Sequence, residues 1–259
     1  MLYEKSNYTA DISYLTNVFI YEYDISKCNI NVLFTKGAIN KETYDMLYEA
    51  PRMKRQVYVG MLQKDSEIAK LLNDGITEAR KMFFEANNIQ DREVLSIKKD
   101  AIFIINRPMT VTKFGLIEFL QKNTYTSFFK LSGLELYYYY SNIDKSEYLD
   151  VKGISKRLSL HEGYFMQILK DIFYSIQVNG PDISLRMIKD IYNQYITRQF
   201  PVEYYREFDA RSVYHIMNSV YDLDAMSEDQ KYMLDINKNL FLLMQLQRIA
   251  TSIYFNKYR

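Results

Sequence analysis

The stretch EVLSIKKDAIFIIN, at residues 93–106, decides the fold. It contains two runs of Val, Leu, Ile and Phe, which favour strands, on either side of a polar tip at 98–100. We therefore expect a β-hairpin with Asp100 at its turn. A similar run, VFIYEYDI at 18–25, predicts another strand, with Asp24 near its end. If that strand and the hairpin share one antiparallel sheet, the carboxylates of Asp24 and Asp100 meet at the same edge.

The remaining chain divides into a strand-rich part and a helix-rich part. Asn40, followed by Glu42, signals the start of a helix that ends at Pro51, because an Asn side chain can cap free helix N–H groups. Apolar residues then recur at helical spacing from about 57 to 87, with a break expected at 73–75. Further strands are expected at 113–120, 127–131, 135–140 and 148–154, and further helices at 161–178, 182–198, 210–222 and 228–256.

These elements predict an α+β protein with two domains. Residues 1–157 would form an antiparallel sheet with packed helices, and residues 158–259 an all-helical C-terminal part. The length of 259 residues suits one large domain or two small ones. A content of 48% hydrophobic and 25% charged residues is typical of a globular protein.

Membrane insertion and secretion are not expected. No apolar run reaches the roughly 18 residues that a bilayer span needs, and charges interrupt the N-terminal residues where a signal peptide would be apolar. The single cysteine, Cys28, cannot form an internal disulfide, which suits a reducing compartment. We therefore expect a cytoplasmic protein without a membrane partner.

The charge of the chain is nearly balanced, with a formal net charge of +1, so it carries no global signature of nucleic-acid binding. Residues 98–157 nevertheless contain 10 basic and 6 acidic residues, a surplus of four. This surplus fits either contact with nucleic acid or a sheet edge that lysines protect from aggregation. The 25 Tyr and 15 Phe, with no Trp, fit either base stacking or an AT-rich genome.

Many common catalytic motifs are absent from the sequence. One Cys and two distant His cannot form a zinc cluster, and no P-loop, Gly-x-Gly-x-x-Gly or Gly-x-Ser-x-Gly motif occurs. The candidates that remain are Asp24 and Asp100. Two carboxylates at one sheet edge can hold Mg²⁺ (or Mn²⁺) for phosphoryl transfer, whereas the simpler interpretation makes each an ordinary turn or capping acid.

Several segments resemble the palm and thumb of a family B DNA polymerase. YDISKCNINVL (23–33) resembles that family's first metal motif, Asp-x-x-Ser-Leu-Tyr-Pro-Ser-Ile-Ile, with Asp24 on the metal-binding aspartate. GITEARKMFFEANNIQDREVLSIKKDAIFI (75–104) resembles the region that contains Tyr-Gly-Asp-Thr-Asp-Ser, and Asp100 falls on its second aspartate. NTYTSFF and LDVKGI (149–154) resemble the Lys-Lys-x-Tyr and Lys-Gly elements that hold the primer end.

The resemblance implies a palm-like domain with a short fingers-like helical insertion at about 38–75, followed by a thumb-like domain. It implies a template-directed nucleotidyltransferase, similar to a DNA or RNA polymerase or primase. Such an enzyme would use metals held by Asp24 and Asp100, nucleoside triphosphates and a nucleic-acid primer–template. A shortened polymerase with an AT-rich composition also suggests a phage or mobile element. The resemblance assigns Asn29, Arg52, Lys54 and Arg55 to the nucleotide, and Lys122, Tyr125 and Lys152 to nucleic acid.

The chain departs from the family pattern at two important positions. Lys98 replaces the first aspartate of the second motif, and Asn29 replaces the tyrosine that excludes a ribose 2′-hydroxyl. One alternative is therefore a catalytically degenerate palm that binds nucleic acid or serves as a scaffold for a protein partner, because an ammonium beside Asp100 can neutralise it. Another is an unrelated α/β protein with protein partners and with Tyr137 to Tyr140 on a sheet face.

Overall fold

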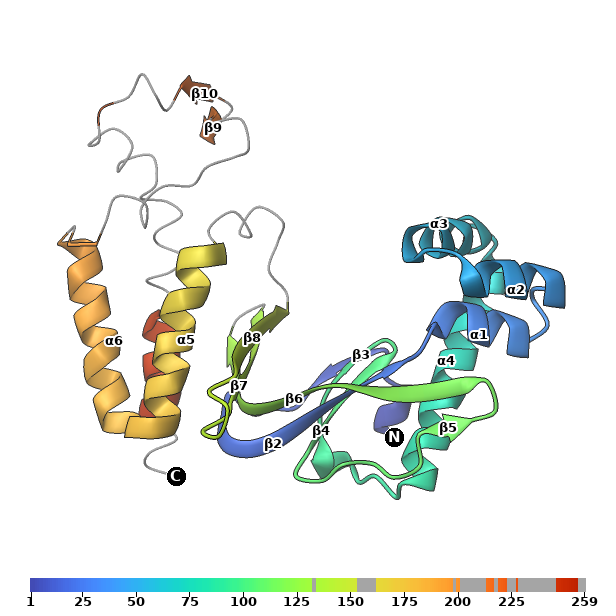
Figure 1. Cartoon of the computed structure of the whole chain (residues 1–259), viewed down its shortest axis with the longest axis horizontal. Coiled ribbons are helices and arrows are strands. Elements are labelled where there is room, and N and C mark those ends of the chain that lie inside the picture. Colours follow the sequence, from blue (N-terminus) through green and yellow to red (C-terminus); the bar gives the residue numbers. More distant parts are fainter. Residues whose placement is uncertain are drawn as a thin grey trace. The chain divides into compact units, whose positions relative to one another are not determined.

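The chain is α+β, as expected, with an antiparallel sheet and with helices toward the C-terminus (Figure 1). It forms two compact units, Met1–Ile12 with Val18–Thr124, and Ser13–Asn17 with Tyr125–Arg259. The domain boundary expected at residue 157 stays a prediction. The computed structural model describes residues 1–131, 134–152, 162–197, 199–200, 213–216, 219–222, 227 and 246–255.

The strands that contribute to the first unit are β1 (Asn7–Thr9), β2 (Tyr14–Ile25), β3 (Val94–Lys98), β4 (Ala101–Ile105), β5 (Lys113–Phe114) and β6 (Ile117–Leu131). Their order is β1-β3-β4-β2-β6, with β5 paired to β6, and β2 and β6 each contribute residues to both units. The pairs β3–β4 and β2–β4 are antiparallel. The expectation that strands 18–24, 93–98 and 101–106 share one antiparallel sheet is therefore confirmed.

The α-helices of the first unit are α1 (Cys28–Thr35), α2 (Lys41–Glu49), α3 (Arg52–Leu62) and α4 (Ser66–Ala86), and two short 3-10 helices lie at Leu2–Glu4 and Asp91–Glu93. Figure 1 shows α1, α2 and α3 grouped at the end of β2 that leads into α1. Apolar residues of α1, α2, α4 and the strands form one buried core. The expected cap of α2 is present, because the Asn40 side chain accepts a hydrogen bond from the Thr43 N–H at 2.9 Å.

The helix break expected at 73–75 is wrong. The interruption lies at 63–65, where the Asp65 side chain accepts from the Glu67 N–H at 2.8 Å and caps α4. Gly75 lies inside α4, at a point where another helix passes close to it. A Cβ added there would lie 2.3 Å from Cγ1 of Val32 on α1. The glycine therefore permits close helix packing and does not end the helix.

The second unit contains β7 (Leu134–Tyr140), β8 (Glu147–Lys152), α5 (Glu162–Asn179), α6 (Pro181–Ile196), β9 (Val213–Ile216), β10 (Ser219–Asp222) and a helix at 246–255. β6, β7 and β8 pair in order, and apolar residues of α5, α6 and helix 246–255 share a core with β6 and β7. These three helices lie side by side in Figure 1. Tyr137 and Tyr138 are fully buried, so the tyrosine run of β7 is mainly core.

The helix expected at 210–222 is wrong where the structure describes it. β9 and β10 form an antiparallel pair there, which fits their β-branched and aromatic residues better than a helix does. The C-terminal part is accordingly not all-helical. Of the helix expected at 228–256, residues 246–255 are helical, and 228–245 and 256 lie outside the described residues, as do 153–154 of the last expected strand and 161 at the start of the first expected C-terminal helix.

Candidate active site

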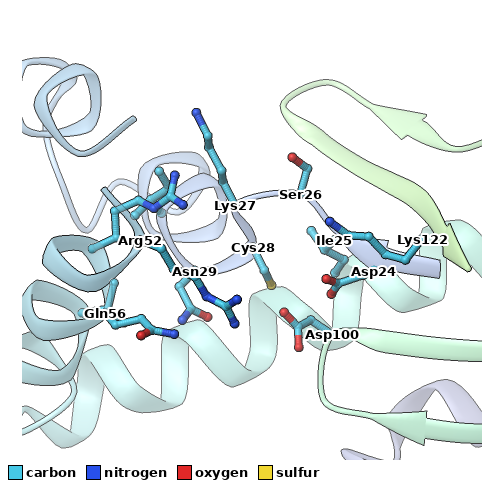
Figure 2. Close-up of a pocket in the computed structure, with 13 residues that line it drawn as sticks. Asp24, Ile25, Ser26, Lys27, Cys28, Asn29, Arg52, Gln56, Asp100 and Lys122 are labelled. Atoms are coloured by element: carbon cyan, nitrogen blue, oxygen red, sulfur yellow. The ribbon is translucent and has the colours of Figure 1, made fainter. Parts of the chain in front are cut away.

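Two neighbouring strands bring Asp24 and Asp100 together. In the β2–β4 pair Asp24 lies opposite Ala101, and the Ile25 N–H donates to the Asp100 carbonyl at 3.3 Å. Figure 2 shows the two carboxylates next to one another. The sheet edge thus presents two candidate metal ligands, while their catalytic role stays a prediction.

At the hairpin tip that carries Asp100, the side chain of Lys98 binds residues of β1. The Lys98 ammonium donates to Asn7 Oδ1 and Thr9 Oγ1, at 3.1 Å in each case, and so lies against β1. Lys99 has a left-handed φ of 55°, and its N–H donates to the Ser6 carbonyl at 2.8 Å. The Lys98 side chain therefore binds the neighbouring strand, and its position does not support the idea that it neutralises Asp100.

The two carboxylates line a pocket of about 330 Å³ within the first unit (Figure 2). Its walls come from the end of β2, the start of α1, one face of α3, the β3–β4 turn and β6. The lining residues are Asp24, Ile25, Ser26, Lys27, Cys28, Asn29, Ile30, Arg52, Arg55, Gln56, Val59, Asp100 and Lys122.

The environment of the pocket perturbs the ionisation of Asp24. Burial, and after it the Asp100 carboxylate, raise the pKa of Asp24 to about 6, while Lys122 and Arg52 act in the opposite direction. Burial, Asp100 and Asp24 also raise the pKa of the Cys28 thiol. Negative charge is thus concentrated where the sheet edge meets the pocket, which is the environment that a divalent cation relieves.

The opposite wall of the pocket suits an anion. The first turn of α1 lines it with Cys28, Asn29 and Ile30, and the first N–H groups of a helix have no partner within the helix. The N-cap residue, Lys27, makes no side-chain cap, because an ammonium cannot accept from the helix N–H groups, and it donates instead to the Tyr48 carbonyl at 2.7 Å. Free N–H groups and the positive end of a helix dipole form a site for phosphate.

Basic side chains complete this polar pocket. Arg52 and Arg55 reach it from α3 and Lys122 from β6, and Asn29 lies in the first turn of α1. Gln56, one turn from Arg52 on α3, also lines the pocket, and its position was not foreseen. Lys54, on the same helix, does not line the pocket, because the helical repeat turns it away from the Arg52 and Arg55 face.

Two residues assigned to nucleic acid lie in the second unit and have other partners. Tyr125 is fully buried, and its hydroxyl donates to Asp150 Oδ2 at 3.1 Å. The Lys152 ammonium forms an ion pair with the same oxygen at 2.5 Å. A buried ring offers no face to a base, so a stacking role for Tyr125 does not fit the structure.

Within the described part of the chain, no group of three or more His, Cys, Asp or Glu side chains could hold a metal ion. A Mg²⁺ ion bound by the two carboxylates would need further ligands from substrate oxygens and water, which is a common arrangement for this ion. None of the described helices has the length and apolar composition that crossing a bilayer requires.

Comparison with known proteins places the chain in a phage family. The model of the family described as Bacteriophage PBS1 gene 130 protein matches residues 1–252, nearly the whole chain. No curated protein matches it. The phage origin suggested by the sequence agrees with this match. The chain therefore belongs to the bacteriophage PBS1 gene 130 protein family.

Proposed function

We propose that this protein is a divergent, metal-dependent nucleotidyltransferase that extends a nucleic-acid primer on a template. The observation that supports it best is the pocket where Asp24, near the end of β2, and Asp100, in the β3–β4 turn, face basic side chains and a helix N-terminus. This combination can hold both a divalent cation and the phosphates of a nucleotide. The resemblance to a family B polymerase palm supports the same proposal.

Asp24 and Asp100 would hold Mg²⁺ or Mn²⁺. Carboxylate oxygens are the ligands that these hard cations prefer, and the raised pKa of Asp24 reflects a negative charge that lacks sufficient compensation. A bound cation would activate the primer hydroxyl and neutralise charge on the phosphate. The chain's own contribution is to fix the two carboxylates on a sheet, so that little ordering is needed when the reactants bind.

The nucleotide phosphates would lie between α1 and α3. Arg52 and Arg55 can donate paired hydrogen bonds to phosphate oxygens, and the first N–H groups of α1 can donate from the other side. Gln56 and Asn29 add neutral donors in the same pocket. Lys122, which lies near Asp24 in Figure 2, would contact the primer end. These groups position the α-phosphate for in-line attack and need not act as acids or bases.

A degenerate palm that only binds nucleic acid remains the second candidate. The specific observation that favours it is the small number of metal ligands, since the described residues provide two carboxylates and no third ligand close by. This candidate retains the basic pocket but predicts no nucleotide incorporation. The two functions therefore differ in a single measurable property.

Nucleotide incorporation by the wild type, and its loss in Asp100→Asn, decides between them. The variant removes a metal ligand but leaves the basic wall of the pocket, so incorporation with Mg²⁺ or Mn²⁺ should fall by at least about 100-fold, since loss of metal-held charge stabilisation costs several kcal/mol. Binding of a fluorescent primer–template should stay within about twofold, because it depends on phosphate contacts.

Asp74→Asn is the matched control, because Asp74 is an exposed acid of α4 that does not line the pocket. It should incorporate nucleotides as the wild type does. Wild-type protein that binds primer–template but incorporates nothing, over several templates and with both metals, would favour the degenerate palm.

A further inference from the structure

Arg80, in the interior of α4, is the most deeply buried charged side chain among the described residues. Its exposed fraction is 2%, against 7% for Glu22 and 8% for Glu135. A charge that is removed from water strongly destabilises a fold unless polar groups or an opposite charge compensate it. The partners of Arg80 therefore indicate what this charge is for.

The guanidinium of Arg80 connects three segments of the first unit. Nε donates to the Tyr3 carbonyl at 2.7 Å, Nη2 donates to Thr77 Oγ1 at 3.1 Å, and Nη1 donates to the Lys99 carbonyl. Only an arginine provides several donors in one rigid plane, so a lysine cannot reproduce this set of contacts. The N-terminal segment, α4 and the β3–β4 turn are thus joined at one side chain.

The contact with Lys99 matters most, because the Lys99 carbonyl belongs to the peptide group that leads into Asp100. On one side of this peptide, Lys99 has a φ of 55° and its N–H is bound to the Ser6 carbonyl. On the other side, the Asp100 carbonyl accepts from the Ile25 N–H. With Arg80 on the carbonyl between them, the direction in which the Asp100 side chain leaves the backbone is fixed.

The charge of Arg80 also acts on this site. Burial lowers the pKa of Arg80, and the negative charge of the Asp100 carboxylate works against that shift. Asp100 and Asp24 lie next to one another, and two adjacent carboxylates repel each other. A buried cation beneath the hairpin tip offsets part of this repulsion at a position that solvent does not screen.

We propose that Arg80 is a positioning residue of the candidate metal pair. Its guanidinium fixes the Lys99–Asp100 peptide so that the Asp100 carboxylate faces Asp24, and its charge lets the two carboxylates remain adjacent before a divalent cation binds. The purpose of this arrangement rests on the proposed function. The positioning itself does not, and it can be measured without metal or substrate.

The test compares Arg80→Lys with Arg107→Lys. Arg107 is a matched control, because it also fastens a loop through carbonyls, those of Asn87 and Asn88 at 3.0 and 3.2 Å, and it does not line the pocket. Hydrogen exchange of the Lys99 and Ile25 amides would be followed in metal-free protein. The affinity for Mn²⁺ would be measured from the electron paramagnetic resonance of the free ion.

In Arg80→Lys both amides should exchange at least about tenfold faster than in the wild type, and the Mn²⁺ affinity should fall by roughly 10- to 100-fold, the usual effect of losing a group that orients a metal ligand. Arg107→Lys should leave both values unchanged. Thr77→Val removes one partner of Arg80 and is the milder variant if Arg80→Lys does not fold. It should shift both values in the same direction by a smaller factor.

Folded Arg80→Lys or Thr77→Val protein with wild-type exchange at Lys99 and Ile25 would overturn the proposal. Faster exchange with an unchanged Mn²⁺ affinity would also overturn it, because Arg80 would then hold the turn without serving the pair. Wild-type protein that binds no Mn²⁺ would instead refute the proposed function, and the exchange rates would still decide whether Arg80 positions Asp100.

Discussion

At the scale of single residues, the environment of an acidic side chain determines whether its charge is available to bind a ligand. Asp24 and Asp150 are both acids on strands, yet they differ in their partners. Asp150 accepts from Tyr125 and pairs with Lys152, so its charge is used within the fold. Asp24 lies in a pocket beside a second carboxylate, and its pKa is raised to about 6. An acid that the fold leaves undercompensated is a candidate for ligand binding.

Asp24→Asn should stabilise the metal-free protein at neutral pH. The pKa of Asp24 is raised from 3.8 to about 6 in the folded state, so the folded protein holds this proton more tightly than the unfolded chain does. The contribution of Asp24 to stability is therefore fully present below the unfolded pKa and is lost as the pH rises through about 6. The gain in Tm of the variant should be largest above about pH 7 and shrink toward about pH 4, as measured by circular dichroism in EDTA.

Asp74→Asn, at an exposed position on α4, controls for the general effect of removing a negative charge. Its Tm difference from the wild type should vary little across the same pH range. A gain in Tm for Asp24→Asn that is equal at pH 4 and pH 8 would show that ionisation of Asp24 does not destabilise the folded protein.

Several residues singled out by sequence motifs line the pocket, because a motif specifies both a residue type and its place at the end of a strand or on a helix. Asp24, Asp100, Asn29, Arg52, Arg55 and Lys122 all line the pocket. Tyr125 is buried and does not line the pocket, which the sequence could not indicate, since a tyrosine on a strand points to one face or the other and the sequence does not say which face is covered. Arg80 was not foreseen either, because a lone arginine in an amphipathic helix usually faces solvent.

At the scale of elements, the packing of α4 against α1 helps to fix the position of the pocket residues on α1. α1 follows β2 directly and provides the first-turn residues of the pocket, while α4 carries Arg80. Gly75 allows the close approach of the two helices, since Val32 occupies the space where a side chain at residue 75 would be. A change in this packing should therefore affect both stability and the pocket.

Gly75→Ala should destabilise the protein. Overpacking a core usually costs roughly 1–3 kcal/mol, and the gain in helix propensity offsets at most about 1 kcal/mol of that cost. The added Cβ would lie 2.3 Å from Cγ1 of Val32, whose branched side chain has one strongly preferred rotamer in a helix. Urea unfolding measures the loss. Val32→Ala in the same chain should recover part of it, because the obstructing methyl group is removed.

Gly60→Ala is the matched control for helix propensity. Gly60 lies inside α3, and a Cβ added there meets no atom within 4 Å. That variant should be neutral or more stable by roughly 0.5–1 kcal/mol. Equal effects at Gly75 and Gly60 would contradict the packing role of Gly75.

Elements with strong local signals were predicted well, and the others depended on tertiary contacts. The hairpin at 93–106 and the cap at Asn40 are local, and both are present. α1 was missed, because its eight residues are too few to show a clear helical repeat. β6 was expected as two strands, yet its 15 residues continue through a polar stretch. It pairs with β5 near its start and with β7 near its end, and β2 is its other neighbour in the sheet.

At the scale of the whole molecule, the charge is almost balanced. A net charge of +1 gives no long-range attraction to nucleic acid. Any salt-dependent binding must therefore come from a local cluster, and among the described residues Arg52, Arg55 and Lys122 form such a cluster around the pocket. The lysines of the second unit that have acidic partners should add little, since an ion pair is already neutral.

Salt dependence of primer–template binding tests this localisation. Each phosphate contact by a lysine releases condensed counterions, so Lys122→Ala should flatten the log–log slope of affinity against salt by roughly one. Lys152→Ala should leave the slope unchanged, because the Lys152 ammonium is paired with Asp150 at 2.5 Å. A fluorescent primer–template titrated at several salt concentrations measures both slopes. Equal flattening by the two variants would mean that the second unit contributes phosphate contacts of its own. No flattening by either would contradict the proposed contact between Lys122 and the primer end.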